Sequence, residues 1–346
     1  MTRYISLRKM AAIAWKFFPD MYLPKDFIVT PEGLGFAVLI EGMDEGKVLG
    51  FLRYLALPAN DAYPQGRWQK IATADANALL ANDYPDYLYY SPRIAASCHA
   101  IPVANIQRHF SPRARVQALL STPHNDPVLT DCAQMLRLLQ RAGVDLHYVG
   151  VTGSLLLGAQ QASSDIDLVF YDAQVFAQAR QALQNLLLQP KSAATAGLQA
   201  LAREDWEEAY QRRDCDLTLA EYVWHEQRKY NKVLINRRKV DLSLLVLSDA
   251  GASAASHKLG PITLRCQVQA AERAYHYPAE YQIAATEVQQ VLCFTATYIG
   301  QALAGEWIEV AGQLEVDAAG QRRLVVGSSR EAHGEYIKVI AHAAEV

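Results

Sequence analysis

A glycine-serine pair, followed after ten residues by two aspartates, constrains the fold of this chain more than any other feature. Gly153 and Ser154 end an apolar run, and Asp165 and Asp167 lie two residues apart among apolar neighbours. We predict a strand, a tight turn that opens a short helix, and a second strand that carries both acids. Side chains two positions apart on a strand face the same side, so the two carboxylates share one surface. Because Mg²⁺ prefers carboxylate oxygens, and the backbone N–H groups of such a turn bind phosphate, the pattern predicts a metal and phosphate site.

A third carboxylate usually completes a site of this kind, and Asp241 is the best candidate. It lies in an apolar, β-like stretch over residues 239–245, directly after a basic segment. Asp214, Asp216 and Glu221 are alternatives, but they occupy a charge-rich segment that favours exposure to water. The other interpretation of Asp241 is a turn carboxylate that balances the neighbouring cations.

Six cationic residues and no acid lie between positions 228 and 239. The whole chain has 33 Lys and Arg against 36 Asp and Glu, and this formal net charge of −3 excludes a polycation. Any contact with a nucleic acid must therefore come from a local basic patch. We expect this segment to form a hairpin in which Lys232, Arg237 and Arg238 contact nucleotide phosphates. The alternative is an edge strand that its charges protect against pairing.

The order of these features resembles the signature of the DNA polymerase β-like nucleotidyltransferase superfamily. That signature is an apolar strand, a Gly-Ser or Gly-Gly pair, two acids separated by one apolar residue, and a later third acid on a strand. The similarity covers roughly residues 144–246 and includes Gly158 and Ser164, the residue before the first acid. It departs at residues 155–157, where three leucines replace the arginines that minimal members often carry. The phosphates of a bound nucleotide therefore need cations from elsewhere.

The resemblance implies two sets of site residues. The catalytic and metal-binding set, which would hold two Mg²⁺ ions with Mn²⁺ as an alternative, is Asp165, Asp167 and Asp241. The nucleotide-binding set joins the three hairpin cations named above to Gly153, Ser154 and Ser164.

The chain divides into three parts and is of the α+β class. We expect a β-rich N-terminal domain over residues 1–111, a nucleotidyltransferase domain with a mixed sheet and helices over 112–260, and a small C-terminal β-barrel over 261–346. The composition, 51% apolar and 20% charged, excludes disorder. The candidate strands of the last part are 262–270, 288–299, 307–316, 322–326 and 336–341.

The C-terminal part also resembles a known fold. The run from residue 304 to 328 is similar to strands of an OB-fold, a barrel that often binds single-stranded nucleic acid. We expect exposed aromatic side chains there, such as Trp307 and Tyr298, to stack on unpaired bases of an acceptor. The alternative is a barrel that serves only as a structural cap.

The cysteines and the apolar runs bear on location. The five cysteines are widely spaced and form no Cys-x-x-Cys pair, which argues against a disulfide framework and against a zinc site. No stretch is long and apolar enough to span a membrane, and the first residues do not form a signal peptide. We therefore expect a cytoplasmic protein with no membrane partner.

Together these features predict an enzyme, a nucleotidyltransferase. It would move a nucleoside monophosphate from an NTP, such as ATP, to a hydroxyl acceptor and release pyrophosphate. The acceptor would be a nucleic-acid 3′ end, including that of tRNA or another single strand, a protein or a small molecule. Two alternatives stay open: a non-catalytic nucleic-acid-binding protein that retains the fold, and a modifier of a partner protein in a toxin-antitoxin-like system. The sequence leaves the acceptor, the base preference and the oligomeric state open.

Overall fold

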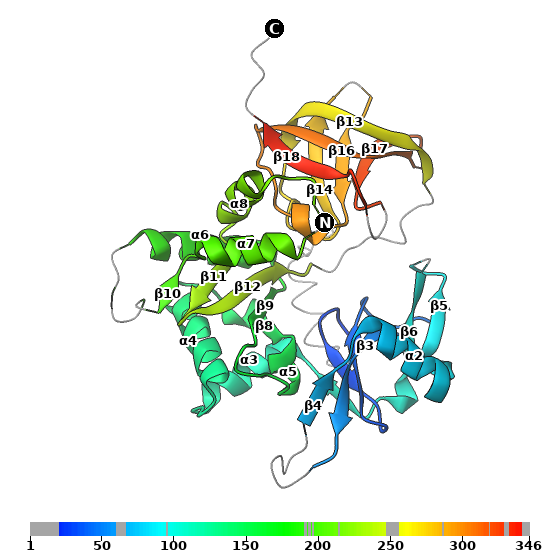
Figure 1. Cartoon of the computed structure of the whole chain (residues 1–346), viewed down its shortest axis with the longest axis vertical. Helices are drawn as coiled ribbons and strands as arrows, with labels where there is room; N and C mark the ends of the chain where they lie inside the picture. The colour runs from blue at the N-terminus through cyan, green and yellow to red at the C-terminus, as the bar shows by residue number, and fades with distance from the viewer. Residues whose placement is uncertain are drawn as a thin grey trace, which may run out of the picture. The chain divides into compact units, whose positions relative to one another are not determined.

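The structure is a computed structural model with two compact units, which are described separately below (Figure 1). The first unit extends to Pro112 and includes Leu156–Ala159, and the second consists of Arg113–Leu155 and the chain from Gln160 onward. Both combine helices and sheets, as expected for the α+β class. Asp214, an alternative for the third acid, lies outside the described residues. The residues that the structure describes are 21–59, 67–94, 96–189, 192, 195, 197–213, 215–246, 256–285, 287–317, 319–328 and 332–340.

The first unit is built on a seven-stranded sheet of order β5-β6-β3-β2-β1-β7, in which β4 also pairs with β3. The helix α2 (Thr73–Asp83) packs on the apolar side chains of this sheet through Ala76 and Leu80. The strands are β1 (Phe27–Val29), β2 (Leu34–Val38), β3 (Lys47–Leu57), β4 (Arg67–Lys70), β5 (Leu88–Ser91), β6 (Ala96–Pro102) and β7 (Arg108–Phe110). Two 3₁₀ helices, η1 (Pro85–Tyr87) and η2 (Val103–Asn105), follow α2 and β6.

The second unit begins with a five-stranded mixed sheet of order β10-β11-β12-β9-β8. Strands β9 and β12 run parallel, and the other pairs are antiparallel. The expected hairpin is β11 and β12, joined by Asn236 and Arg237, which both have positive φ angles. The strands are β8 (Val149–Thr152), β9 (Ile166–Phe170), β10 (Leu198–Gln199), β11 (Lys232–Ile235) and β12 (Arg238–Leu244).

Aspartate caps fix the two long helices of this sheet. The Asp126 carboxylate accepts hydrogen bonds from two backbone N–H groups at the start of α4, and Asp172 does the same for α6. Such caps satisfy N–H groups that have no partner inside a helix. The apolar sides of both helices form one core with the inner face of the sheet, including Ile166, Leu168 and Val240. The helices are α3 (Pro112–Ser121), α4 (Pro127–Arg141), α5 (Ser154–Leu157) and α6 (Ala173–Leu188), with the 3₁₀ helix η3 (Leu146–Tyr148).

The C-terminal strands close into a barrel, as expected from the sequence. The ring runs β13-β14-β15-β17-β16 and closes by the pairing of β16 with β13, while β18 adds to β16 outside the ring. The strands are β13 (His257–Ala270), β14 (Ala279–Ala284), β15 (Gln290–Cys293), β16 (Trp307–Val316), β17 (Arg322–Val326) and β18 (Tyr336–Ile340). Figure 1 shows these strands wrapped around one another in yellow, orange and red.

Two expectations for the barrel are wrong. The strand expected over 288–299 ends at Cys293 and is followed by the 3₁₀ helix η4 (Ala296–Tyr298). Tyr298, expected as an exposed stacking residue, is 3% exposed and belongs to the barrel core. The strand β14, which was not predicted from the sequence, is one of the five strands of the barrel. Trp307 is half-buried.

The barrel shares its core with two helices of the central part. Trp206 on α7 (Arg203–Gln211) and Tyr222 on α8 (Leu219–Gln227) belong to the same apolar cluster as the inner residues of the barrel. Tyr275, between β13 and β14, packs on Phe176 of α6, with ring centroids 5.3 Å apart. The central sheet and the barrel therefore form one compact unit. Within the described part of the chain, no helix combines the length and apolarity needed to cross a membrane.

Candidate functional site

One residue from each of four neighbouring strands forms a row across the central sheet. The register pairs Thr152 of β8 with Asp167 of β9, Asp167 with Asp241 of β12, and Asp241 with Lys232 of β11. Directly opposed residues of paired strands share a face of the sheet. Asp165, two residues before Asp167, faces the same side. The fold therefore brings the three acids expected from the sequence onto one face, with a lysine at the end of the row.

Gly153 holds the turn against this row. Its φ angle is +66°, and a Cβ atom at this position would lie 2.4 Å from the Oδ2 atom of Asp167. Only glycine meets both demands, since other L-residues disfavour this conformation and the Cβ would collide with the carboxylate. Ser154 follows as the first residue of α5. The expected Gly-Ser turn therefore lies directly beside the second acid.

The three leucines after Ser154 do not face this row. Leu155 belongs to the core of the central sheet, whereas Leu156 and Leu157 pack within the first unit against Phe27 and Tyr54. Their apolar character is thus explained by packing.

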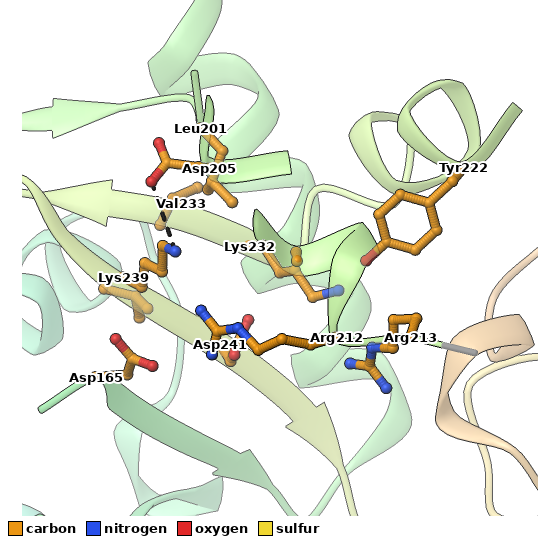
Figure 2. Close-up of a pocket in the computed structure, with 12 residues that line it drawn as sticks. Asp165, Leu201, Asp205, Arg212, Arg213, Tyr222, Lys232, Val233, Lys239 and Asp241 are labelled. Carbon is orange, nitrogen blue, oxygen red and sulfur yellow. Dashed lines mark ion pairs between the residues drawn. The ribbon is translucent and has the colours of Figure 1, made fainter. Parts of the chain in front are cut away.

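A pocket of about 280 Å³ opens on the acidic face, between the hairpin and helices α7 and α8. Figure 2 shows Asp165 and Asp241 together with Lys232 and Arg212 around the same space. The residues that line the pocket are Asp165, Leu201, Asp205, Ala209, Arg212, Arg213, Tyr222, Lys232, Val233, Lys239, Val240 and Asp241.

The hairpin supplies only part of the expected phosphate-binding cations. Lys232 lines the pocket, but Arg237 and Arg238 do not. Arg238 lies three positions from Asp241, so its side chain faces the opposite side of the sheet. There it binds Asp131 of α4 at 2.8 Å and the carbonyl oxygen of Ser164 at 2.8 Å. Arg237 is exposed in the hairpin turn.

Ser164 has a local role. Its hydroxyl accepts a hydrogen bond of 2.9 Å from the backbone N–H of Gln161, and its N–H donates to the Gln161 carbonyl. These bonds close the turn that leads into Asp165. The structure therefore gives Ser164 a role in the geometry of the first acid.

Two arginines and a tyrosine of the pocket were not identified from the sequence. Arg212 and Arg213 follow α7, and Tyr222 lies on α8. The Tyr222 side chain is 1% exposed; its hydroxyl has the Arg213 guanidinium as a neighbour and makes no hydrogen bond of ordinary geometry to a described residue. Two arginines at the end of a helix are also explained by the helix dipole, which favours cations at the C-terminus. The sequence therefore carried no signal specific to a ligand at these positions.

A buried ion cluster supports the lysine end of the row. Glu226, which is 4% exposed, pairs with Lys232 and with Lys229 at 2.5 Å. Lys229 also donates to the carbonyl oxygen of Thr297 at 3.1 Å, which ties α8 to the barrel. Although burial opposes it, the two lysines hold the pKa of Glu226 at about 2. Burial likewise opposes the charge of Lys232, but Glu226 and Asp241 raise its pKa.

Asp241 is the most perturbed acid of the row. Burial raises its pKa to about 6, and the negative charges of Asp167 and Asp165 add to the effect while Lys232 opposes it. The carboxylates are therefore close enough to repel one another. A divalent cation between them would relieve that repulsion.

The donor chemistry of the row fits Mg²⁺. The ion takes hard oxygen ligands and is usually held by one or two carboxylates together with substrate phosphates and water. Asp167 and Asp241, directly opposed on parallel strands, meet this need, and Asp165 adds a third carboxylate on the same face. Among the described residues, no group of three or more His, Cys, Asp and Glu side chains is arranged as a ready metal site.

The alternatives for the third acid lie elsewhere. Asp216 accepts a hydrogen bond of 2.9 Å from the Gly334 N–H of the barrel. Glu221 forms a capping box with Thr218 at the start of α8. Neither lines the acidic pocket, which leaves Asp241 in the expected position.

Fold and site together define a class: an α+β protein whose mixed sheet carries a row of acids beside a Gly-Ser turn, with a closed five-stranded barrel in the same unit. The chain belongs to the family of "Uncharacterized protein MJ1086" from Methanocaldococcus jannaschii. The two are 32% identical over 339 residues, which covers 91% of this chain and 98% of the relative. No protein-family model and no solved structure matches the chain.

Proposed function

We propose that the protein is a metal-dependent nucleotidyltransferase of the polymerase β-like kind, which transfers a nucleoside monophosphate from an NTP to a hydroxyl. The observation that carries the proposal is the direct pairing of Asp167 with Asp241, together with the Gly153 turn that abuts Asp167. Acids of a strand face exposed only to water need neither a glycine-fitted turn nor a second acid on the adjacent strand.

The acids have separate roles in this proposal. Asp165 and Asp167, with Asp241, would hold Mg²⁺, which supplies positive charge for the phosphates of the nucleotide and for the charge that develops during transfer. Asp241 accepts the proton of the attacking hydroxyl. The hydroxyl oxygen forms a bond to the α-phosphorus, and the bond from that phosphorus to the departing pyrophosphate breaks.

Phosphate contacts come from the cations of the acidic pocket. Lys232 is fixed beside Asp241 by Glu226, and Arg212 and Arg213 enter from the end of α7. Lys239 lines the same pocket and pairs with Asp205 at 3.6 Å (Figure 2). It also pairs with Glu208 at 2.5 Å. Arginine is suited to phosphate because its planar guanidinium donates two parallel hydrogen bonds. These cations take the role of the arginines that minimal members of the superfamily often carry where this chain has leucines at 155–157.

The barrel takes the acceptor in this proposal. An OB-like barrel binds single strands through aromatic stacking, which favours a nucleic-acid 3′ end, tRNA included, over a small molecule. Because the barrel shares its core with α7 and α8, acceptor and pocket are connected through the same helices.

Incubation with each labelled NTP, Mg²⁺, and RNA, DNA or cell extract tests the proposal. We expect incorporation of label that requires the metal and is lost in Asp165→Asn with Asp167→Asn. Asp83→Asn, at an exposed acid of the first unit, is the matched control and keeps full activity. Undiminished transfer in the double variant contradicts the proposal. Nucleic-acid binding without any transfer favours the non-catalytic alternative.

A further inference from the structure

A second pocket lies on the other side of α8, between this helix and the barrel. Its volume is about 740 Å³, and its walls include Trp224 of α8, Trp307 of β16 and Val339 of β18. Trp224 and Tyr222 are two positions apart on a helix, so they face nearly opposite sides. Tyr222 lines the acidic pocket and Trp224 lines this one, which we name the tryptophan pocket.

We propose that the tryptophan pocket binds the ring of an unpaired nucleobase of the acceptor strand. The proposal rests on the proposed function in that it names the acceptor as a single-stranded nucleic acid. The base would stack on an indole, and its polar edge would meet the side chains of the rim.

Trp224 is exposed but held in place. Its side chain is 49% exposed, and the Arg228 guanidinium lies 4.4 Å from its ring centroid. Arg228 is itself fixed by an ion pair with Glu306. A large apolar surface that is both exposed and fixed is a prepared stacking platform, because little side-chain entropy is lost when a ring binds to it.

His225 fixes the helix against the barrel at the same place. It is 2% exposed, its Nδ1 donates to the Glu221 carbonyl at 2.7 Å, and its Nε2 accepts from the Val339 N–H at 3.0 Å. The ring is therefore neutral and has no free nitrogen for a ligand. Its place is to hold α8, and with it Trp224, against β18.

The charges around the pocket are balanced, which favours an uncharged ring. Arg228 neutralises Glu306, and Lys338 lies 3.7 Å from Glu221. Among the described residues that line the pocket, a free triphosphate would find no unpaired cation, and a cationic ligand would find no unpaired carboxylate. Gln267, whose Nε2 donates to the Gly305 carbonyl at 3.0 Å, offers its amide oxygen to a ring N–H or an amino group of a base.

The test measures binding of two labelled ten-nucleotide strands by fluorescence anisotropy, without NTP or metal. One strand carries thymine at every position, and the other has the same backbone without bases. We expect the wild type to prefer the strand with bases, and Trp224→Ala and Trp307→Ala each to weaken its binding about tenfold or more, as for other stacked bases. Trp224→Phe keeps a ring and should retain most of the affinity. Tyr90→Ala, at a tyrosine that is 61% exposed in the first unit, is the control and should bind as the wild type does.

Several outcomes would overturn the proposal. These are equal affinity of the wild type for the two strands, no binding of either, or wild-type affinity in both tryptophan-to-alanine variants. Binding of a peptide in place of the strand, lost in the same variants, would assign the pocket to a protein partner instead. Since Trp224 is half exposed, its truncation leaves the fold intact, and circular dichroism verifies this.

The same titration of Asp165→Asn with Asp167→Asn separates this proposal from the proposed function. If the wild type shows no transfer but still binds the strand, the proposed enzymatic function is wrong and the proposal for the tryptophan pocket stands. If the wild type transfers nucleotides to nucleic acid and both tryptophan-to-alanine variants bind the strand normally, the proposed function stands and the proposal for the tryptophan pocket is wrong.

Discussion

A Cβ atom at Gly153 would lie 2.4 Å from the Oδ2 atom of Asp167. The turn and the second acid are therefore fitted to each other, although fourteen positions separate them in the sequence. A carboxylate this close to the backbone of the turn brings its oxygens and the turn's N–H groups into one small volume. Such a volume suits a phosphate and its metal ion.

Gly153→Ala should abolish transfer and destabilise the protein. The variant strains a left-handed residue, at about 1–2 kcal/mol, and adds a clash with Asp167 of roughly 1–3 kcal/mol. Gly158→Ala is the control, since Gly158 also has a positive φ angle, +72°, but has nothing within 4 Å of its added Cβ. Urea unfolding and the transfer assay measure both variants. Equal losses in the two would show that the clash with Asp167 has no consequence.

Asp241→Asn should stabilise the metal-free protein while removing transfer. The pKa of Asp241 is about 6 in the folded state, above its ordinary value, because burial and the neighbouring acids disfavour the charge. The folded state therefore binds more protons between about pH 4 and 6, and stability falls as the pH rises through that window. At pH 8 in EDTA, we expect the variant to gain about 1–3 kcal/mol in free energy of unfolding.

Mg²⁺ provides the second readout of that variant. It should raise the melting temperature of the wild type, where the carboxylates bind it, and leave that of Asp241→Asn nearly unchanged. A lower stability of the variant in EDTA, or an equal response of both proteins to Mg²⁺, would contradict the assignment of Asp241.

Arg212→Ala with Arg213→Ala should weaken NTP binding about tenfold or more, since each charge-assisted contact contributes roughly 1.5–3 kcal/mol. Arg237→Ala, at the exposed hairpin turn outside the pocket, is the control and should leave affinity unchanged. Equilibrium dialysis with labelled ATP and Mg²⁺ measures all three proteins. A loss of NTP affinity in Arg237→Ala alone would show that the hairpin turn, and not the end of α7, contacts the phosphates.

The acids were accessible to sequence reasoning because strand periodicity is local. Asp165 and Asp167 share a face by their spacing alone, and the apolar neighbours of Asp241 indicate a strand. The same rule places the Arg238 side chain on the face of the sheet opposite to Asp241. This inference depends on where the hairpin turn lies, and a sequence determines that position only to within a few residues. The pairing of Asp241 with Asp167 itself depends on a parallel register that no local pattern encodes.

The remaining site residues depend on packing between distant elements. Arg212 and Arg213 reach the pocket because Trp206 of α7 is buried in a core shared with the barrel. Strand β14 was missed for a local reason: it begins and ends with alanine, which strands disfavour, and Pro278 precedes it. Its inward side chains, Tyr281 among them, take their place only when the ring closes.

The buried ion cluster of Glu226, Lys229 and Lys232 should contribute to stability as a coupled unit. Glu226→Gln leaves Lys229 and Lys232 without their carboxylate, and Lys229→Met leaves Glu226 with one lysine. Loss of the shared carboxylate costs about 3–5 kcal/mol, so Glu226→Gln should be strongly destabilised, whereas Lys229→Met keeps Glu226 paired with Lys232 and should cost less. The double variant should lose less than the sum, because the remaining charges are fewer. Additive losses in urea unfolding would contradict a coupled cluster.

Acid should destabilise the first unit through His99. His99 is 2% exposed; its Nδ1 accepts a hydrogen bond of 2.9 Å from the Leu52 N–H, and its Nε2 lies 2.9 Å from the Asn77 amide oxygen. Burial lowers the pKa of His99 to about 4, and a proton on Nδ1 would face the Leu52 N–H.

Since the unfolded chain binds this proton near pH 6.5, stability is complete above about pH 7 and falls as the pH drops toward 4, by about 1–3 kcal/mol. Hydrogen exchange of the Leu52 amide measures this loss directly, and should accelerate over that window more than its intrinsic chemistry accounts for. In His99→Gln, the amide side chain does not titrate, so the free energy of opening at Leu52 should become independent of pH between 7 and 4. An unchanged pH dependence in that variant would assign the acid instability to other groups, because His99 is the titrating side chain that contacts the Leu52 N–H directly.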